Sequence, residues 1–355
     1  MPIYKDYRYT EKEDHIIIRA YCGDNVDIVV PEAIKGKPVR EISPFAFVPE
    51  MDEIEIANND YKKRCSKRIH SVQLPDTVLR LELAFACCFE LEEICIPRHA
   101  ELIEDNFHLC YALKRIHVDT DHPMYTSRNG ILYSKDGTKL LRCPPGHACD
   151  SDNILSGVTE IGANAFEFCA NLTELVISET VVKIEGLAFA NCHNLASIKL
   201  HENIQMVGGG HFWCCKALDN VIYYNTDEAI PAHEFYSCTS LKHIDVRSKI
   251  GTIGESSFSS TALVDFSVPI GTKAINKYAF LNCNELKNIR IPRSVSRIHK
   301  DAFTGCGRNY YTPDQLKDVS TNFGMKPAAT FGVVNGSKAE KFCLDNNYAI
   351  FCLQG

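Results

Sequence analysis

The chain has 355 residues, of which 45% are hydrophobic and 23% are charged, and its formal net charge is −7. This composition is typical of a globular protein that buries a sizeable core, and it excludes a wholly disordered chain. The acidic balance argues against nucleic acid as a partner, because nucleic-acid-binding proteins usually present a basic face. No run of 18 or more apolar residues occurs, so we expect no membrane insertion.

The first 40 residues combine a polar start with strand-like runs. Residues 1–15 lack the apolar core of a secretory signal, so the chain as written is expected in the cytoplasm. A chain whose leader had been removed would look the same, and it would be at the cell surface or secreted. The runs HIIIRAY and VDIVVP are rich in β-branched residues, precede GKPVREI, and predict strands.

A repeat of about 23 residues occupies residues 41–306. Its marker is a phenylalanine, and most successive markers are 22 or 23 residues apart. The markers are Phe47, Phe85, Phe107, Phe166, Phe189, Phe212, Phe235, Phe258, Phe280 and Phe303. Two longer steps between markers indicate insertions near residues 57–71 and 119–157.

Two further features keep step with the phenylalanine. A cysteine stands three residues after it in eight copies, at Cys88, Cys110, Cys169, Cys192, Cys215, Cys238, Cys283 and Cys306. An apolar triplet L-x-x-I-x-I follows, and its last two members alternate as strand residues do. One such unit cannot bury its own apolar side, so the pattern predicts stacked coils with short parallel strands, a repeat solenoid.

The second insertion and the C-terminal segment carry turn and helix signals. Asn129-Gly130 and Asp136-Gly137 are strong turn dipeptides around ILYS and TKLL, which predicts a β-hairpin. Near the C-terminus, Ser337-x-x-Glu340 is a capping box that predicts the start of a short helix. Asn346-Asn347 can end that helix.

The form AF-x-x-C-x-x-L-x-x-I-x-I-P resembles the BspA-like leucine-rich repeat family over nearly the whole chain. The resemblance implies an α/β horseshoe-like leucine-rich repeat solenoid with its short parallel strands on the concave face. It also implies a β-rich N-terminal capping module over residues 1–40, repeats over 41–306 and an α/β C-terminal capping module over 307–355, all in one solenoid domain. Segments 57–68 and 307–326 depart from the family pattern and receive no assignment.

The chain has 17 cysteines, which raises the question of disulfides or metal binding. Column cysteines in adjacent coils would lie about 5 Å apart, within reach of a disulfide. A small, buried, reduced thiol is the favoured interpretation, and the odd total agrees with it. Cys143, His147 and Cys149 form the best zinc candidate, but they supply three ligands at most. We expect a turn there and no metal or cofactor.

The chain is predicted not to be an enzyme, because the sequence shows no set of nucleophile, base and orienting group that would assemble around one cleft. An enzyme would instead show a deep polar pocket outside the repeat lattice, most plausibly at the inserted hairpin.

A partner would bind at the outward-facing strand positions, which show no single charge or chemistry. Candidate ligand-binding residues are Glu55, His117, Val176, Lys199, Ile222, Tyr224, Asp245, Arg247 and Arg290. The alternative is a plain solvated sheet face. Trp213 and Tyr236 are of the types enriched in interface hot spots, but they could equally pack between adjacent turns.

These features predict a non-enzymatic module that binds a protein partner. The family resemblance implies adhesion or interaction with a host or partner protein, often at bacterial surfaces. The alternative is an intracellular scaffold that binds a cytosolic protein.

Overall fold

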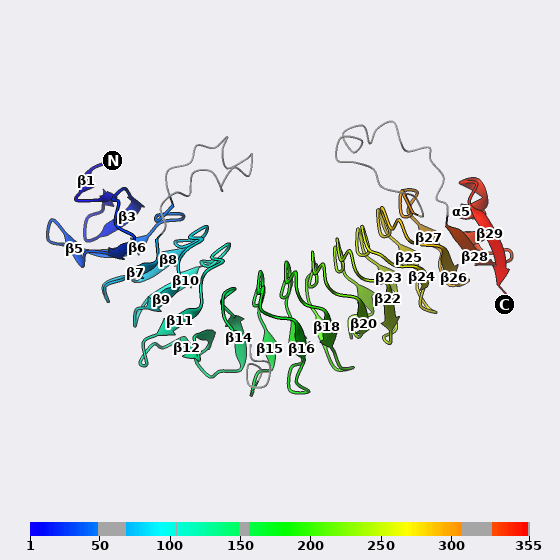
Figure 1. Ribbon diagram of the computed structural model, residues 1–355, viewed down its shortest axis with the longest axis horizontal. Coiled ribbons are helices and arrows are strands. Elements are labelled where there is room, and N and C mark those ends of the chain that lie inside the picture. Colours follow the sequence, from blue (N-terminus) through cyan, green and yellow to red (C-terminus); the bar gives the residue numbers. More distant parts are fainter. Residues whose placement is uncertain (49–68, 104, 149–155, 307–328, 354–355) are drawn as a thin grey trace. The chain divides into compact units, whose positions relative to one another are not determined.

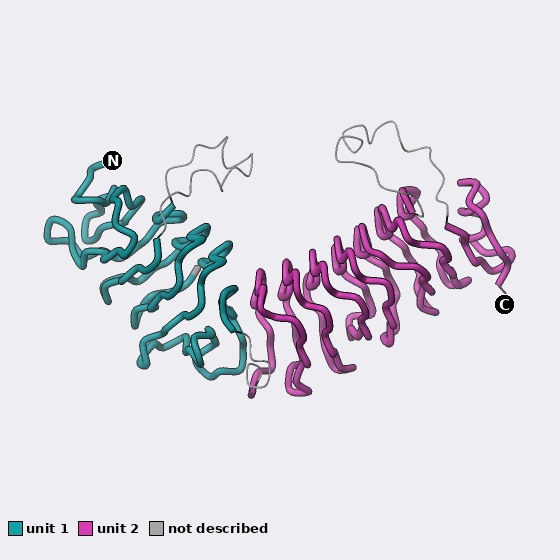
Figure 2. The backbone as a smooth tube through the Cα atoms, viewed as in Figure 1, with its two compact units in different colours: residues 1–149 teal, residues 150–355 magenta. Residues whose placement is uncertain are grey.

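The computed structural model describes residues 1–48, 69–103, 105–148, 156–306 and 329–353. Two compact units divide the chain, Met1–Cys149 and Asp150–Gly355 (Figure 2). In each unit the chain winds into successive coils whose strands pair in parallel with those of the neighbouring coils (Figure 1). The predicted repeat solenoid is confirmed. Segments 57–68 and 307–326 lie outside the described residues.

A β-rich segment opens unit 1, as predicted. Its strands are β1 (Ile3–Tyr4), β2 (Tyr7–Glu11), β3 (Ile16–Tyr21), β4 (Asp27–Val29), β5 (Ala33–Ile34) and β6 (Lys37–Ile42). β1, β2 and β3 pair in antiparallel fashion, whereas β3 pairs in parallel with β6. The change of direction joins an antiparallel meander to the parallel stack of the repeats.

The strands of the repeats in unit 1 form two rows, and each coil contributes one strand to each row. Their strands are β7 (Ser71–Gln73), β8 (Arg80–Glu82), β9 (Glu93–Ile96), β10 (Glu101–Ile103) and β11 (Arg115–Val118). β6, β8 and β10 form one row, and β4, β7, β9 and β11 form the other. Neighbours within a row are parallel, which is the arrangement that stacked identical coils require.

The second insertion folds as the predicted hairpin and adds a third strand. Its strands are β12 (Tyr125–Arg128), β13 (Ile131–Ser134) and β14 (Lys139–Arg142). Asn129 and Gly130 both have positive φ, 53° and 84°, as a two-residue hairpin turn requires. The buried His122 fastens the start of the insertion, because its Nε2 lies 3.0 Å from the Ala100 carbonyl and its Nδ1 accepts the Tyr125 N–H at 3.1 Å. Burial lowers the pKa of His122.

Unit 2 repeats the two-row plan through successive coils. The shorter strands are β15 (Glu160–Ile161), β17 (Lys183–Ile184), β19 (Gln205–Met206), β21 (Ala229–Ile230), β23 (Thr252–Ile253), β25 (Ala274–Ile275) and β27 (Arg297–Ile298). The longer strands are β16 (Glu174–Val176), β18 (Ser197–Lys199), β20 (Asn220–Tyr223), β22 (His243–Val246), β24 (Asp265–Ser267) and β26 (Asn288–Ile291). The longer strands form the sheet β16–β18–β20–β22 and, with β28 (Thr330–Val334) and β29 (Ala349–Leu353), the sheet β24–β26–β28–β29.

The C-terminal segment is the predicted α/β element. It consists of β28 (Thr330–Val334), α5 (Lys338–Asp345) and β29 (Ala349–Leu353). The Ser337 hydroxyl accepts the Glu340 N–H at 3.1 Å, and the Glu340 carboxylate accepts the Gly336 N–H at 2.7 Å. Asn347, with φ of 56°, follows the helix and reverses the chain. Among the described residues, no helix has the length and apolar character needed to cross a membrane.

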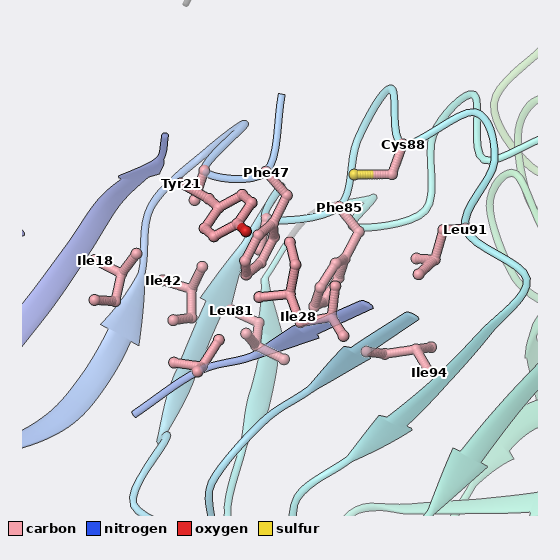
Figure 3. Close-up of a cluster of buried hydrophobic side chains, with 14 of the residues drawn as sticks. Ile18, Tyr21, Ile28, Ile42, Phe47, Leu81, Phe85, Cys88, Leu91 and Ile94 are labelled. Carbon is pink, nitrogen blue, oxygen red and sulfur yellow. The ribbon is translucent and has the colours of Figure 1, made fainter. Parts of the chain in front are cut away.

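The repeat phenylalanines form the centre of each core as a stack of rings. In unit 2, Phe212 lies 5.3 Å from Phe235 between ring centroids, with the planes only 5° apart. In unit 1 the pair Phe47 and Phe85 stacks at 5.4 Å, among the aliphatic side chains of the strands (Figure 3). Each ring therefore packs against its own coil and its neighbours, which explains why the residue recurs once per repeat.

The column cysteines are buried, as predicted, and six of them use the thiol as a hydrogen-bond donor. The Sγ atom lies 2.9–3.1 Å from the carbonyl of the repeat phenylalanine in the preceding coil at Cys110, Cys192, Cys215, Cys238, Cys283 and Cys306. Thr261 replaces cysteine in one coil, and its hydroxyl bonds the Phe258 carbonyl of its own coil at 2.9 Å. The position therefore requires a small donor, which a disulfide would remove. Burial raises the pKa of the Cys215 and Cys238 thiols well above the usual value.

Most coils have two residues with left-handed backbone geometry, two positions before and two positions after the phenylalanine; around Phe107 and Phe303 only the later position has it. Around Phe189 they are Leu187 and Asn191, with φ of 58° and 60°. Their N–H groups donate to the next coil, to the carbonyls of Gly209 at 3.0 Å and Trp213 at 2.7 Å. This ladder offsets the strain of positive φ in residues other than glycine.

Candidate interaction surfaces

The outer face of β16, β18, β20 and β22 brings four of the predicted residues into one row. Val176 lies beside Lys199, Lys199 beside Ile222, and Ile222 beside Asp245 in the strand register. All four side chains are exposed, and the two aliphatic ones are unusually so, Val176 at 60% and Ile222 at 47%. Their strand neighbours on either side are buried, or half-buried in the case of Asp245, so the alternation expected from the sequence holds here.

Asp245, Arg247 and Tyr224 extend this row at one edge. The Arg247 guanidinium donates to the Asp245 carboxylate, with Nε to Oδ2 at 2.7 Å, and this bond raises the pKa of Arg247. Tyr224 is half-buried and follows β20, while the Arg247 N–H donates to the Tyr223 carbonyl at 3.0 Å. The edge therefore presents a paired acid and base beside a tyrosine.

The remaining predicted residues lie elsewhere. Arg290 is exposed on β26, in the other long-strand sheet of unit 2, between Ser267 and Gly332 in the register. His117 is exposed on β11 in unit 1, with Nε2 3.6 Å from Glu93. Glu55 lies outside the described residues.

Trp213 and Tyr236 form a small aromatic cluster with His233 at the turn of their coils. The Trp213 ring stacks on His233 at 5.6 Å between centroids and meets Tyr236 edge-on at 5.4 Å. Trp213 packs between adjacent turns, and it also keeps 37% of its surface exposed.

The same two coils contain a buried ionic pair that the sequence analysis did not predict. His211 Nδ1 is 2.6 Å from Glu234 Oε2, and both side chains are fully buried. His211 Nε2 lies 3.2 Å from the Val207 carbonyl, and the Tyr223 hydroxyl donates to Glu234 at 3.2 Å. Burial opposes the charged imidazole, but Glu234 outweighs it and raises the pKa of His211. Both ring nitrogens face acceptors, which is the arrangement of an imidazolium.

A cavity of about 660 Å³ lies at the inserted hairpin of unit 1, where an enzyme was expected to show a polar pocket. Its polar lining includes Ser127 and His147, which could suggest a nucleophile and a base. The Ser127 hydroxyl accepts the Val118 N–H at 3.3 Å, and His147 Nε2 lies 2.9 Å from the Asn129 carbonyl. These bonds tie Ser127 to the backbone of β11 and His147 to the backbone of the hairpin turn.

The residues of the zinc candidate have different surroundings. Cys143 is fully buried, with its Sγ 3.9 Å from the Pro144 carbonyl, whereas His147 lines the cavity. Cys149 lies outside the described residues. The segment forms a turn beside the hairpin, in agreement with the favoured interpretation.

The stacked coils, parallel strand rows and internal phenylalanine column define a leucine-rich repeat solenoid. The chain belongs to the BspA type leucine-rich repeat family. The family model, described as a BspA type leucine rich repeat region, matches in six copies over residues 40–129, 159–287 and 251–323, more than half of the chain. The resemblance inferred from the repeat pattern is confirmed.

Two solved structures are similar to this chain, and the first supports the fold. A leucine-rich repeat protein from Eubacterium ventriosum is 20% identical with a TM-score of 0.60, over 85% of this chain and 92% of that chain. The pneumococcal vaccine antigen PcpA is 15% identical with a TM-score of 0.49, over 99% and 98% of the two chains. The first of these shows the fold alone. Comparison with curated proteins finds no match.

Proposed function

We propose that this chain is a repeat module that binds a protein partner and has no catalytic activity of its own. The partner lies across the outer face of β16, β18, β20 and β22. The observation that carries this proposal is the exposed row of Val176, Lys199, Ile222 and Asp245. These two branched aliphatic side chains lie on a solvated strand face and do not pack in the core. A partner that covers them removes their apolar surface from water, which is favourable.

The row combines apolar and charged side chains. Parallel strands lie about 4.8 Å apart, so the four side chains span about 14 Å. Val176 and Ile222 supply the apolar area, and the Asp245–Arg247 pair lies at one end with Tyr224. Lys199 lies between the two aliphatic side chains, so a partner that covers the row must match apolar area and charge together.

We further propose that the interaction is adhesive, with a host or other cell-surface protein as the partner, and that the chain acts outside the cell. The family supports partner binding but does not specify the compartment. Buried thiols do not oppose this setting, because burial keeps column thiols such as Cys215 protonated and therefore unreactive. A cytosolic scaffold is the alternative that the location experiment distinguishes.

The face is tested with the double variant Val176→Asp/Ile222→Asp and the control Val182→Asp. Val182 is 49% exposed and lies away from this face, so the control places one of the double variant's two added negative charges elsewhere. Wild-type and control chains are immobilised and cross-linked to surface proteins of neighbouring cells, and both should retain the same partner. The affinity of the double variant for that partner should be lower by tenfold or more. Equal affinity of the double variant would remove this face from the proposal.

The setting is tested by fractionating the producing cell and treating intact cells with protease. Adhesion predicts that the chain is cleaved from intact cells. A chain that is protected and found in the cytosol would contradict adhesion and direct the partner search to cytosolic proteins.

A further inference from the structure

The cavity in unit 1 has a lining that no feature of the repeat explains. It lies between β11, the β12–β13 turn and the segment that ends at Ala148, and its volume is about 660 Å³. Ligand sites usually measure about 300–1,000 Å³ and hold a few convergent polar groups. The polar side chains here are Lys114, Arg115, His117, Ser127, Asn129 and His147.

The charged groups of this lining are all basic, in a chain whose net charge is −7. The nearest acids belong to the preceding coil. Lys114 Nζ lies 2.9 Å from Glu92, and Arg115 Nη1 lies 2.9 Å from Glu93, which is also 3.6 Å from His117. Each pair occupies one of the three N–H donors of the lysine and one of the five of the arginine. The remaining donors can meet a ligand.

The hairpin holds the arginine in position. The Ile116 N–H donates to the Gly130 carbonyl at 2.8 Å, which fastens the turn to β11. A Cβ atom on Gly130 would lie 2.8 Å from Cγ of Arg115, so the arginine stem lies directly against this glycine. Glu93 at one side and Gly130 at the other therefore limit where the guanidinium can point.

The opposite wall of the cavity, the segment around Gly146, also packs closely on the coil that carries Lys114. The Gly146 N–H donates to the Leu113 carbonyl at 2.8 Å. A Cβ atom at Gly146 would lie 3.0 Å from the carbonyl oxygens of Ala112 and Leu113. Glycine thus brings this segment onto the backbone just before Lys114.

We propose that this cavity binds an oxyanion, a carboxylate or a phosphate. Arg115 supplies paired N–H donors that match the geometry of such groups, and Lys114 adds a second positive charge. The Ser127 hydroxyl, which accepts the Val118 N–H, can donate its own proton to the ligand. The site lies in unit 1 and shares no residue with the strand face of unit 2, so its success or failure is independent of the function proposed above.

The oxyanion can belong to a free small molecule or to an acidic peptide segment, and the probes separate these sources. The full chain is titrated calorimetrically with inorganic phosphate, with citrate and with an acetylated tetraglutamate amide, at constant ionic strength. Saturable binding of phosphate or citrate identifies a small-molecule site. Saturable binding of the peptide alone identifies an acidic segment as the ligand.

Three variants decide whether these residues form the site. Lys114→Gln/Arg115→Gln should weaken binding at least tenfold. The control Lys242→Gln/His243→Gln changes the same repeat positions in unit 2, where Lys242 faces Asp219 at 3.6 Å, and should bind as wild type does. Glu92→Gln/Glu93→Gln should bind severalfold more tightly, because it releases both cations, and a loss of folding cannot imitate a gain in affinity.

Two results would overturn the proposal. One is the absence of saturable binding for all three probes. The other is unchanged affinity in Lys114→Gln/Arg115→Gln, with circular dichroism showing that the variant is folded.

Discussion

The uninterrupted repeats of unit 2 and the hairpin region of unit 1 place their polar groups in different ways. Where coil follows coil from β16 to β22, exposed residues fall into straight rows on a strand face. Where the β12–β13 turn folds onto β11, a cavity of about 660 Å³ is present. A second cavity, of about 450 Å³, lies beside α5 within unit 2, again where the repeat gives way to another element. In these described regions, the regular strands carry rows of exposed side chains, and both cavities lie where another element meets the repeat.

The largest expected effect comes from breaking the regular stack at its centre. Phe235 is fully buried between Phe212 at 5.3 Å and Phe258 at 5.5 Å. Phe235→Ala should lower the free energy of unfolding by about 3–5 kcal/mol, because neighbouring coils cannot close the space. Denaturant unfolding followed by the fluorescence of Trp213, the single tryptophan, measures it. Ile270→Ala, at a side chain 88% exposed, should change stability by less than about 0.5 kcal/mol.

The next effect tests the one buried ionic pair described for unit 2, between His211 and Glu234. Glu234→Gln should destabilise unit 2 by about 3 kcal/mol, since it removes the negative charge beside a buried imidazolium and leaves one acceptor oxygen where His211 and Tyr223 need two. Tryptophan-detected unfolding again gives the value, and Glu228→Gln, at an exposed acid paired with Lys249, is the control. An equal loss in both variants would mean that the pair contributes no more than a surface contact does.

The same pair predicts a pH dependence. The pKa of His211 is raised in the folded chain, so the folded state binds its proton more tightly than the unfolded state does. The stabilisation is complete below the unfolded pKa of about 6.5 and is lost as the pH rises through the folded pKa. The difference in unfolding free energy between wild type and His211→Gln should therefore shrink from pH 6 toward alkaline pH. A difference that stays constant or grows over that range would contradict the charged pair.

The regular part of the molecule was predictable because the same residue types occupy the same packing positions in nearly every repeat. Phe, Cys and the apolar triplet recur every 22 or 23 residues, so each position could be assigned to the core many times over. The hairpin was equally accessible, because Asn129-Gly130 permits few other conformations. The row of Val176, Lys199, Ile222 and Asp245 also follows from strand alternation, although whether it binds a partner does not.

The cavity and the buried pair could not be foreseen in the same way. Lys114 and Arg115 look like ordinary solvated strand residues until the hairpin folds back onto them. His211 and Glu234 stand 23 residues apart, one repeat, so they share a place in adjacent coils. Opposite charges one period apart were the available signal, and Arg115 with Glu93, 22 residues apart, shows it too.

A smaller effect concerns the irregular region. Gly130 has φ of 84°, so Gly130→Ala should strain the turn by about 1–2 kcal/mol and push the Arg115 stem aside. Hydrogen exchange at the Ile116 amide, which donates to the Gly130 carbonyl, should become faster. Gly157→Ala, also at positive φ but with open space around it, is the matched control, and its exchange at Ile116 should equal that of wild type.

The smallest effect separates shape from hydrogen bonding in the cysteine column. Cys238 donates to the Phe212 carbonyl at 3.0 Å. Cys238→Val keeps an apolar side chain of similar size but removes one of two donors to that carbonyl, which the Cys215 N–H also bonds at 3.1 Å, so it should lower the unfolding free energy by about 0.5–1.5 kcal/mol. Cys238→Thr has the shape of valine and adds a hydroxyl that can donate to the Phe212 carbonyl, so it should recover at least half of that loss. Threonine already occupies this column at Thr261, where its hydroxyl donates to the carbonyl of its own coil. If valine and threonine were equally destabilising, the cysteines would recur for their size, and the thiol hydrogen bond would play no part in holding adjacent coils together.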